Sequence, residues 1–163
     1  MTVFYQTTYS SPIGDLSLLA DEEGLLGVWF LEQRYFQRGY EEILALEEDN
    51  RHLIAARKWL DAYFKGENPS LSALSLCPRG TAFQQRVWQL LQDIPYGETL
   101  TYGDIAQRLN CPSAQAVGGA VGKNPLSIMI PCHRVLGSRG HLTGYAGGLD
   151  RKNWLLAHEQ SAI

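Results

Sequence analysis

Hydrophobic and polar positions alternate with a period of two in residues 3–31, and short turns interrupt the alternation twice. The runs "VFYQTTY", "DLSLLA" and "LLGVWFL" are separated by residues 11–14 and 21–24, which contain Pro12, Gly14 and Gly24. Alternating runs between such turns are typical of strands that pair with their neighbours in sequence. The pattern predicts a three-stranded antiparallel meander.

The period changes to that of a helix after Asn50. In "RHLIAARKWLDAYFKG", Leu53, Leu60 and Phe64 recur at helical spacing, Asn50 is a suitable N-cap and Gly66 a stop. We expect this helix to cover one face of the sheet.

Periodicity fades in residues 67–80, where two prolines and a glycine interrupt the chain. This segment is the candidate linker between an N-terminal α/β domain, residues 1–76, and a C-terminal domain, residues 77–163. We expect Trp29 and Trp59 in the first domain to be core side chains rather than a binding platform.

The second half contains three short helical patterns, each with an N-terminal capping signal. Thr81 with Gln84, and Thr101 with Asp104, have the spacing of capping boxes, and Ser113 is a candidate cap for the third pattern. The predicted helices are "AFQQRVWQLLQDI", "YGDIAQRL" and "AQAVGGAVG". The last two are separated by a short connector, which indicates a helix-turn-helix.

The predicted second helix of this pair, "SAQAVGGAVG", is slim. It has no Arg or Lys to read guanine in a major groove, but its alanines and glycines permit close approach to a backbone, either of a neighbouring helix or in a minor groove about 6 Å wide. We expect Val117, Ala120 and Val121 to pack inward. Gln115 is the one long side chain near the helix start.

Cys132 follows the apolar run "SIMI", which we interpret as a buried strand that Pro131 ends. A thiol with an ordinary pKa of about 8.5 needs a nearby cation or imidazole to ionise, and His133 and Arg134 are candidates. Neighbouring side chains on extended backbone point apart, so His133 would act through a turn or a water, with Glu159 to orient it. The alternative is an inert core thiol.

The segment "VLGSRGHLTGY" predicts two short strands around a turn, shaped like a wing. The following "GYAGG" places Tyr145 beside glycines. Their amides would suit donors aimed at a ligand oxygen, or the segment forms two tight turns around a core tyrosine.

Composition limits the classes of function. The 163 residues are 45% hydrophobic and 19% charged, which is typical of a globular protein, and the net charge of -3 argues against avid nonspecific nucleic-acid binding but permits a local DNA-binding face. No signal peptide pattern or span of about 18 apolar residues is present, so we expect a cytoplasmic protein that does not enter a membrane. Three cysteines without a CxxC pair predict neither a disulfide framework nor a zinc site, and we expect no metal and no cofactor.

The motifs "TYGDIA", "AVGGAVGKNP", "IPCHRV" and "LTGYAGGLDRKNWLLAHE" together resemble the C-terminal half of the O6-alkylguanine-DNA alkyltransferases, also called methylated-DNA–protein-cysteine methyltransferases. The resemblance spans about residues 80–160 in the family's order and spacing. It implies an α+β fold with a ribonuclease H-like N-terminal antiparallel sheet with helices. A C-terminal winged helix-turn-helix domain would carry the reactive cysteine.

The resemblance also implies roles for individual residues. Cys132 would accept the alkyl group, with His133 and Glu159 in a water-bridged relay. Asn124 would brace the turn that carries the active site, and Tyr102 would push the target phosphate and protonate the departing guanine. The remaining implied contacts are with the base and its pocket through Val135, Tyr145 and Ala146, and with the DNA through Gly103, Asn110 and Ser138.

The implied reaction is an irreversible, single-turnover transfer from O6 of guanine, or O4 of thymine, to Cys132. The partner would be duplex DNA that contains O6-alkylguanine, with the target base flipped out, and the protein would act as a monomer with no obligate protein partner. Three alternatives are weighed. An alkyltransferase-like binder lacks the reactive cysteine, which is present here. A winged-helix regulator that senses alkylation or oxidation would need an output domain, and a thiol hydrolase would need an oxyanion hole.

Gln115 departs from the family pattern, which has an arginine at this position to hold the place of the flipped base. Glutamine is shorter and uncharged, so it fills the gap in the base stack less well and adds no attraction to phosphate. We therefore predict that Gln115→Arg strengthens duplex binding or speeds repair. The test is to compare the repair rates of the variant and the parent on a methylated duplex. Equal rates would contradict the idea that glutamine at position 115 limits repair.

Overall fold

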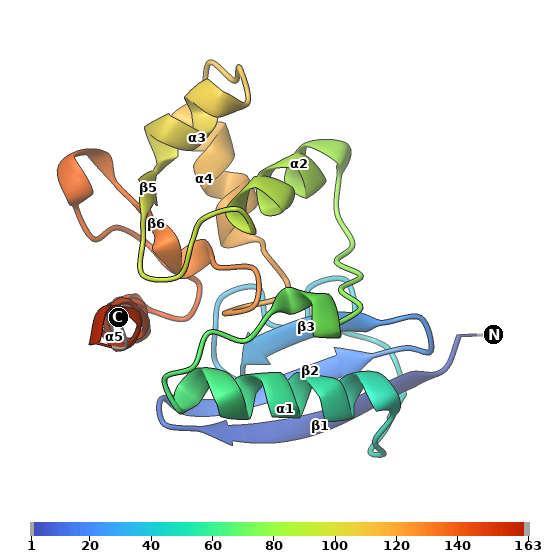
Figure 1. Ribbon diagram of the computed structural model, residues 1–163. Coiled ribbons are helices and arrows are strands. Elements are labelled where there is room, and N and C mark those ends of the chain that lie inside the picture. The colour runs from blue at the N-terminus through green and yellow to red at the C-terminus, as the bar shows by residue number, and fades with distance from the viewer. Residues whose placement is uncertain (1, 162–163) are drawn as a thin grey trace.

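A four-stranded sheet forms the base of the molecule in the computed structural model, which describes residues 2–161 (Figure 1). The strands β1 (Phe4–Ser11), β2 (Gly14–Ala20) and β3 (Leu25–Phe30) pair antiparallel in sequence order. This confirms the predicted meander. The sequence pattern missed a two-residue strand, β4 (Ala45–Leu46), which pairs parallel with β1 at the other edge.

The first helix, α1 (Arg51–Phe64), lies across one face of this sheet, as predicted (Figure 1). Its N-cap is Asn50, whose side chain accepts hydrogen bonds from the backbone N–H groups of His52 and Leu53 at 3.1 and 3.0 Å. After the helix, Gly66 has a φ of 92°, a left-handed conformation that glycine adopts without steric cost.

The expected linker is tied to the edge of the sheet. After a 3-10 turn, η1 (Leu71–Ala73), the chain runs beside β3, where Leu25 N donates to Ser75 O at 2.7 Å and Cys77 N donates to Leu25 O at 2.8 Å. These bonds hold the connection against the sheet and direct it into the upper, helical part of the molecule.

The upper part contains the predicted helices. Both capping boxes form, at Thr81 and at Thr101, and the Ser113 hydroxyl caps the third helix. In the connector of the helix-turn-helix, Asn110 has a φ of 52°, a conformation that asparagine tolerates better than most residues. The helices are α2 (Ala82–Leu91), α3 (Tyr102–Arg108), α4 (Ala114–Gly122) and the C-terminal α5 (Leu149–Ser161).

The predicted buried strand at "SIMI" is wrong, because residues 127–130 form a tight turn. Ile128 has a left-handed φ of 73°, and Ile130 N donates to Leu126 O at 3.0 Å. The side chain of Asn124 satisfies backbone groups at both ends of the turn, so the apolar side chains are buried without a strand ladder. Cys132 therefore opens a 3-10 turn, η2 (Cys132–Arg134), rather than following a strand.

The predicted wing is only partly correct. Its first strand, β6 (Val135–Leu136), pairs parallel with β5 (Leu100–Thr101), and a 3-10 turn, η3 (Ser138–Gly140), follows. Residues 141–144 do not form the expected second strand. The carbonyls of Thr143 and Gly144 instead accept hydrogen bonds from the Lys152 ammonium at 2.6 and 3.2 Å, which replaces a ladder with a tertiary contact.

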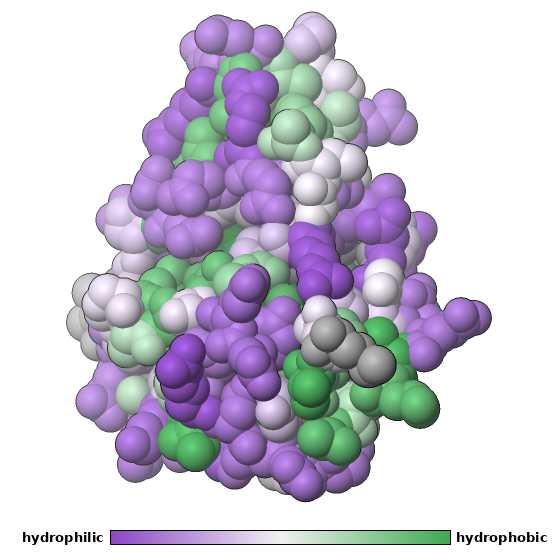
Figure 2. Space-filling view, turned by 90° about the vertical axis from the view of Figure 1, so that its right-hand side faces the viewer, coloured by the Kyte–Doolittle hydropathy of each residue, from purple (hydrophilic) through white to green (hydrophobic). Residues whose placement is uncertain are grey.

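The larger of two hydrophobic clusters runs from the sheet into the upper helices, and the smaller one contains Trp29. The larger cluster joins Leu16 and Phe30 of the sheet to Val117 of α4 and Leu155 of α5. Trp29 and Trp59 are buried, as expected of core side chains. The face seen in Figure 2 is mostly hydrophilic, with an apolar area near its base. Within residues 2–161, no helix has both the length and the apolar character to cross a membrane.

Candidate active site

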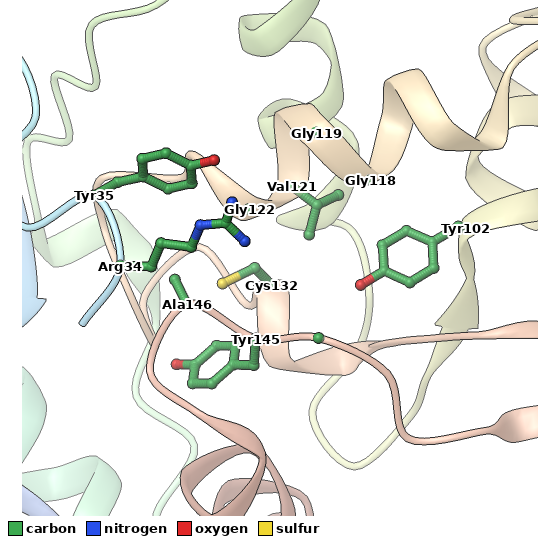
Figure 3. Close-up of a pocket in the computed structure, with 11 residues that line it drawn as sticks. Arg34, Tyr35, Tyr102, Gly118, Gly119, Val121, Gly122, Cys132, Tyr145 and Ala146 are labelled. Atoms are coloured by element: carbon green, nitrogen blue, oxygen red, sulfur yellow. The ribbon is translucent and has the colours of Figure 1, made fainter.

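A pocket of about 360 Å³ lies between α4, the 3-10 turn η2 and two loops, and Cys132 forms part of its wall (Figure 3). Its Sγ atom points toward the loop after β3, and Tyr102 lies on the other side of the pocket (Figure 3). The pocket brings together four of the residues expected from the sequence: Cys132, Tyr102, Tyr145 and Ala146. The other lining residues are Arg34, Tyr35, Gly118, Gly119, Val121, Gly122 and Gly144.

Asn124 holds the turn that carries the thiol. Its Nδ2 donates to Ile130 O at 2.7 Å and to Leu126 O at 3.4 Å, and its Oδ1 accepts from Leu126 N at 3.0 Å. Cys132 N donates to the same Ile130 carbonyl at 2.8 Å. One buried amide therefore connects α4 to the residues directly before the cysteine.

Behind the cysteine, the carboxylate of Glu159 is the centre of a buried hydrogen-bond network. Its Oε2 lies 2.5 Å from His133 Nε2 and accepts from the Tyr63 hydroxyl at 2.6 Å. Its Oε1 accepts from Arg134 Nε at 2.7 Å and from Gly97 N at 3.4 Å. Burial opposes ionisation of this group, but the hydrogen bonds from His133 and Arg134 and the charge of Arg134 outweigh it and hold the pKa of Glu159 well below its ordinary value.

This network sets the tautomer of His133. Burial lowers the pKa of His133, so the imidazole is neutral near pH 7 and carries one proton. Because Nε2 faces an ionised carboxylate that can only accept, the proton lies on Nε2. Nδ1 then has a free lone pair, and it is buried without a hydrogen-bond partner among residues 2–161. The imidazole is therefore prepared to act as a base at Nδ1.

Lys152 is the cation whose charge favours the Cys132 thiolate, and the sequence reasoning missed it. Burial raises the pKa of the Cys132 thiol, while a hydrogen bond from Asn124 and the charge of Lys152 oppose that rise. Burial lowers the pKa of Lys152 to about 8. Arg134, one of the two candidates for this role, is instead bound through its guanidinium to Glu159 and to the Ile94 carbonyl at 2.8 Å.

The residues that the resemblance predicts to contact DNA lie on the surface outside the pocket. Gly103, Asn110, Gln115 and Ser138 are exposed on the helix-turn-helix and on η3, and none of them lines the pocket. Val135 is fully buried, and its N–H donates to Cys132 O. The slim face of α4 connects the two regions, because its glycines line the pocket.

Three further residues of the site were not predicted from the sequence. Arg34 and Tyr35 reach the pocket from the N-terminal half, and Tyr63 of α1 bonds Glu159. No local pattern distinguishes them from surface or core residues, because their roles depend on contacts across 94 or more positions of the chain, such as Tyr63 to Glu159 or Gln33 to Ser127. The one local hint of Arg34 and Tyr35 is the polar segment "EQRY", residues 32–35, directly after an apolar strand.

Comparisons with known proteins agree with this fold. Residues 82–161 match the family model for the 6-O-methylguanine DNA methyltransferase DNA binding domain, and residues 4–78 match its ribonuclease-like domain. The chain belongs to the 6-O-methylguanine DNA methyltransferase family.

Relatives and solved structures support the membership over the full length. A methylated-DNA–protein-cysteine methyltransferase of Haemophilus influenzae is 44% identical over 98% of this chain and 88% of its own length. One from Methanosarcina acetivorans is 46% identical over 96% of this chain and 99% of its own. The crystal structure of Mycobacterium tuberculosis OGT in complex with DNA superimposes with a TM-score of 0.86 at 42% identity, covering 98% of this chain and 94% of that one.

The Glu159 network predicts a stability change with a defined pH dependence. Glu159→Gln leaves the Arg134 cation without its ionic partner, which we expect to lower the free energy of unfolding at pH 7 by about 3 kcal/mol. Because the folded state lowers the pKa of Glu159, its stabilisation is present above the unfolded value of about 4.3 and is lost as the pH falls below it. Urea denaturation between pH 7 and pH 3 should therefore show a smaller acid loss in the variant than in the parent.

The exposed Glu47→Gln is the control for that experiment. It should match the parent across the pH range. The burial of His133 lowers its pKa and destabilises the parent in the same direction below about pH 6.5. Because Glu159 raises the pKa of His133, its removal adds to this loss in the variant, so a smaller acid loss in Glu159→Gln reports Glu159 itself. Equal acid sensitivity of Glu159→Gln and Glu47→Gln would contradict the assigned role.

Proposed function

We propose that this protein repairs duplex DNA by moving the alkyl group from O6 of a flipped-out guanine onto Cys132, once per molecule. The observation that carries the proposal is a pocket thiol directly followed in the chain by a buried, neutral histidine whose Nδ1 has no hydrogen-bond partner among residues 2–161. His133 takes the thiol proton at Nδ1 through a bridging water, and Glu159 stabilises the imidazolium that forms. The positive charge of Lys152 favours the thiolate.

The transfer is a displacement at a saturated carbon. The thiolate forms a bond to the alkyl carbon, the bond from that carbon to O6 breaks, and its electron pair goes to the guanine. The Tyr102 hydroxyl donates a proton to the departing base. Burial raises the pKa of Tyr102, which keeps this hydroxyl protonated near neutral pH. The product is a thioether on Cys132, and a thioether is not hydrolysed, so each molecule acts once.

The shape of the site supports a flipped base. A thiol inside a pocket of about 360 Å³ cannot reach a base within the stack, so the base must enter the pocket. Tyr145 and Ala146 form one wall for it and the glycines of α4 the opposite side. The family resemblance assigns the base edge to the backbone of Val135, which does not itself line the pocket. Gly103, Asn110, Gln115 and Ser138 contact the DNA. One chain supplies all of these groups, which supports action as a monomer.

Identification of the modified residue is the first test. After incubation with duplex DNA containing O6-methylguanine, mass spectrometry should find one added methyl group per chain, on the peptide that contains Cys132, with stoichiometric loss of the lesion. Cys132→Ser should remove transfer, and Cys77→Ser, which changes a thiol outside the pocket, should retain it. Repeated turnover, or a methyl group on another residue, would overturn the proposal.

Proton donation by Tyr102 is tested by Tyr102→Phe, which keeps the ring and removes the hydroxyl. We expect the single-turnover transfer rate to fall by about 100-fold, the lower range for a general acid. The affinity for duplex DNA, measured separately by fluorescence anisotropy, should change much less. A transfer rate equal to that of the parent would exclude this role.

A further inference from the structure

The pocket has a wall that the N-terminal half of the chain provides. Arg34 and Tyr35, in the loop after β3, line the pocket together with Cys132 of the C-terminal half (Figure 3). The Cys132 sulfur points toward this wall and toward Ala146, and Tyr102 lies on the other side (Figure 3).

Two hydrogen bonds hold the loop against the active-site segments, and a third fixes the Gln33 side chain to the end of β3. The buried Gln33 side chain accepts from Ser127 Oγ at 3.1 Å and from Phe30 N at 2.9 Å. Arg34 N donates to Ala146 O at 3.0 Å. The loop is therefore fastened both to the turn before Cys132 and to the segment that carries Tyr145.

The backbone at Tyr35 is in an unfavourable conformation. Its φ of 64° is left-handed, which is a rare conformation for an aromatic residue and has a free-energy cost that other contacts must offset. The Arg34 guanidinium carbon lies 5.1 Å from the centre of the Tyr35 ring, and Lys123 Nζ lies 5.9 Å from it, both within the range of a cation–π contact. These contacts favour a fixed position of the ring at the pocket.

The wall lies where the size of the alkyl group matters. In the proposed displacement, the transferred carbon lies between O6 and the sulfur, so any larger substituent on that carbon must occupy space beside the sulfur. The pocket volume of about 360 Å³ is near the lower end of the roughly 300–1,000 Å³ that is typical of small-molecule sites.

We propose that Arg34 and Tyr35 are specificity-determining residues that limit the size of the alkyl group the protein accepts. This inference rests on the proposed function. It assigns to the N-terminal half a direct part in substrate selection, through side-chain volume beside the thiol. A methyl group fits between the sulfur and this wall, and a benzyl group meets the two side chains.

The test compares two duplexes of one sequence, which carry either O6-methylguanine or O6-benzylguanine. Single-turnover rate constants are measured for the full chain and for Arg34→Ala and Tyr35→Gly, the second of which also removes the left-handed strain. We expect the benzyl-to-methyl rate ratio to rise by about tenfold in each variant, a size of effect that steric discrimination in a pocket commonly reaches.

Two controls separate volume from charge and from general disturbance of the loop. Arg34→Met retains most of the side-chain length without the charge, and its rate ratio should stay near that of the parent. Arg38→Ala removes an exposed arginine of the same loop that does not line the pocket, and it should leave both rates unchanged.

The outcomes distinguish this inference from the function on which it rests. An unchanged ratio in both Arg34→Ala and Tyr35→Gly would overturn the size limit while methyl transfer by the parent continues. Equal losses on both duplexes in Arg34→Ala and Arg34→Met would also overturn it, and would show that Arg34 acts by its charge on the DNA. Failure of the parent to transfer methyl would overturn the proposed function itself.

Discussion

The buried carboxylate of Glu159 is the interaction on which the arrangement of the site depends. It accepts hydrogen bonds from Tyr63 in the N-terminal half and from Arg134 and His133 beside the thiol. A carboxylate taken out of water is unfavourable unless several donors satisfy it, so these partners cannot move independently. The same contacts that stabilise the charge also join α1 to α5 and orient the imidazole. Structural and chemical requirements are met by one group.

The surroundings of the Cys132 thiol limit its reactivity outside the pocket. Burial raises the pKa of Cys132, which limits reaction with oxidants and with other electrophiles, while the hydrogen bond from Asn124 and the charge of Lys152 oppose that rise. A fully exposed thiolate would be consumed by oxidation or by adventitious alkylation. The slim face of α4 gives access to this enclosed group, since glycines there line the pocket.

The two halves of the chain share the site more closely than a division into a sheet domain and a DNA-binding domain suggests. Arg34 and Tyr35 stand beside the sulfur, and Gln33 bonds the turn that precedes it. Motifs that identify the family occur in the C-terminal half. The pocket wall also takes side chains from the N-terminal half.

Local patterns in the sequence determined the elements whose stability is local. The meander, the cap at Asn50, both capping boxes and the helix-turn-helix follow from alternation, turn residues and side-chain-to-backbone bonds within a few positions. The motifs also predicted Cys132 as the reactive residue, with His133 and Glu159 as its partners, and the structure places these two partners 2.5 Å apart. A resemblance carried by short motifs in order needs no tertiary information.

Only the tertiary structure decided how the thiol is presented. The apolar run at 127–130 was interpreted as a strand because burial alone does not distinguish a strand from a turn; Asn124, which lies before the run, satisfies its backbone and makes it a turn. Likewise, the carbonyls of Thr143 and Gly144 accept hydrogen bonds from Lys152 and not from a neighbouring strand, so the second strand of the predicted wing does not form. The cation near the thiol and the N-terminal wall depend on contacts between distant segments. Such contacts are set by the packing of the whole core, and no periodicity along the chain records them.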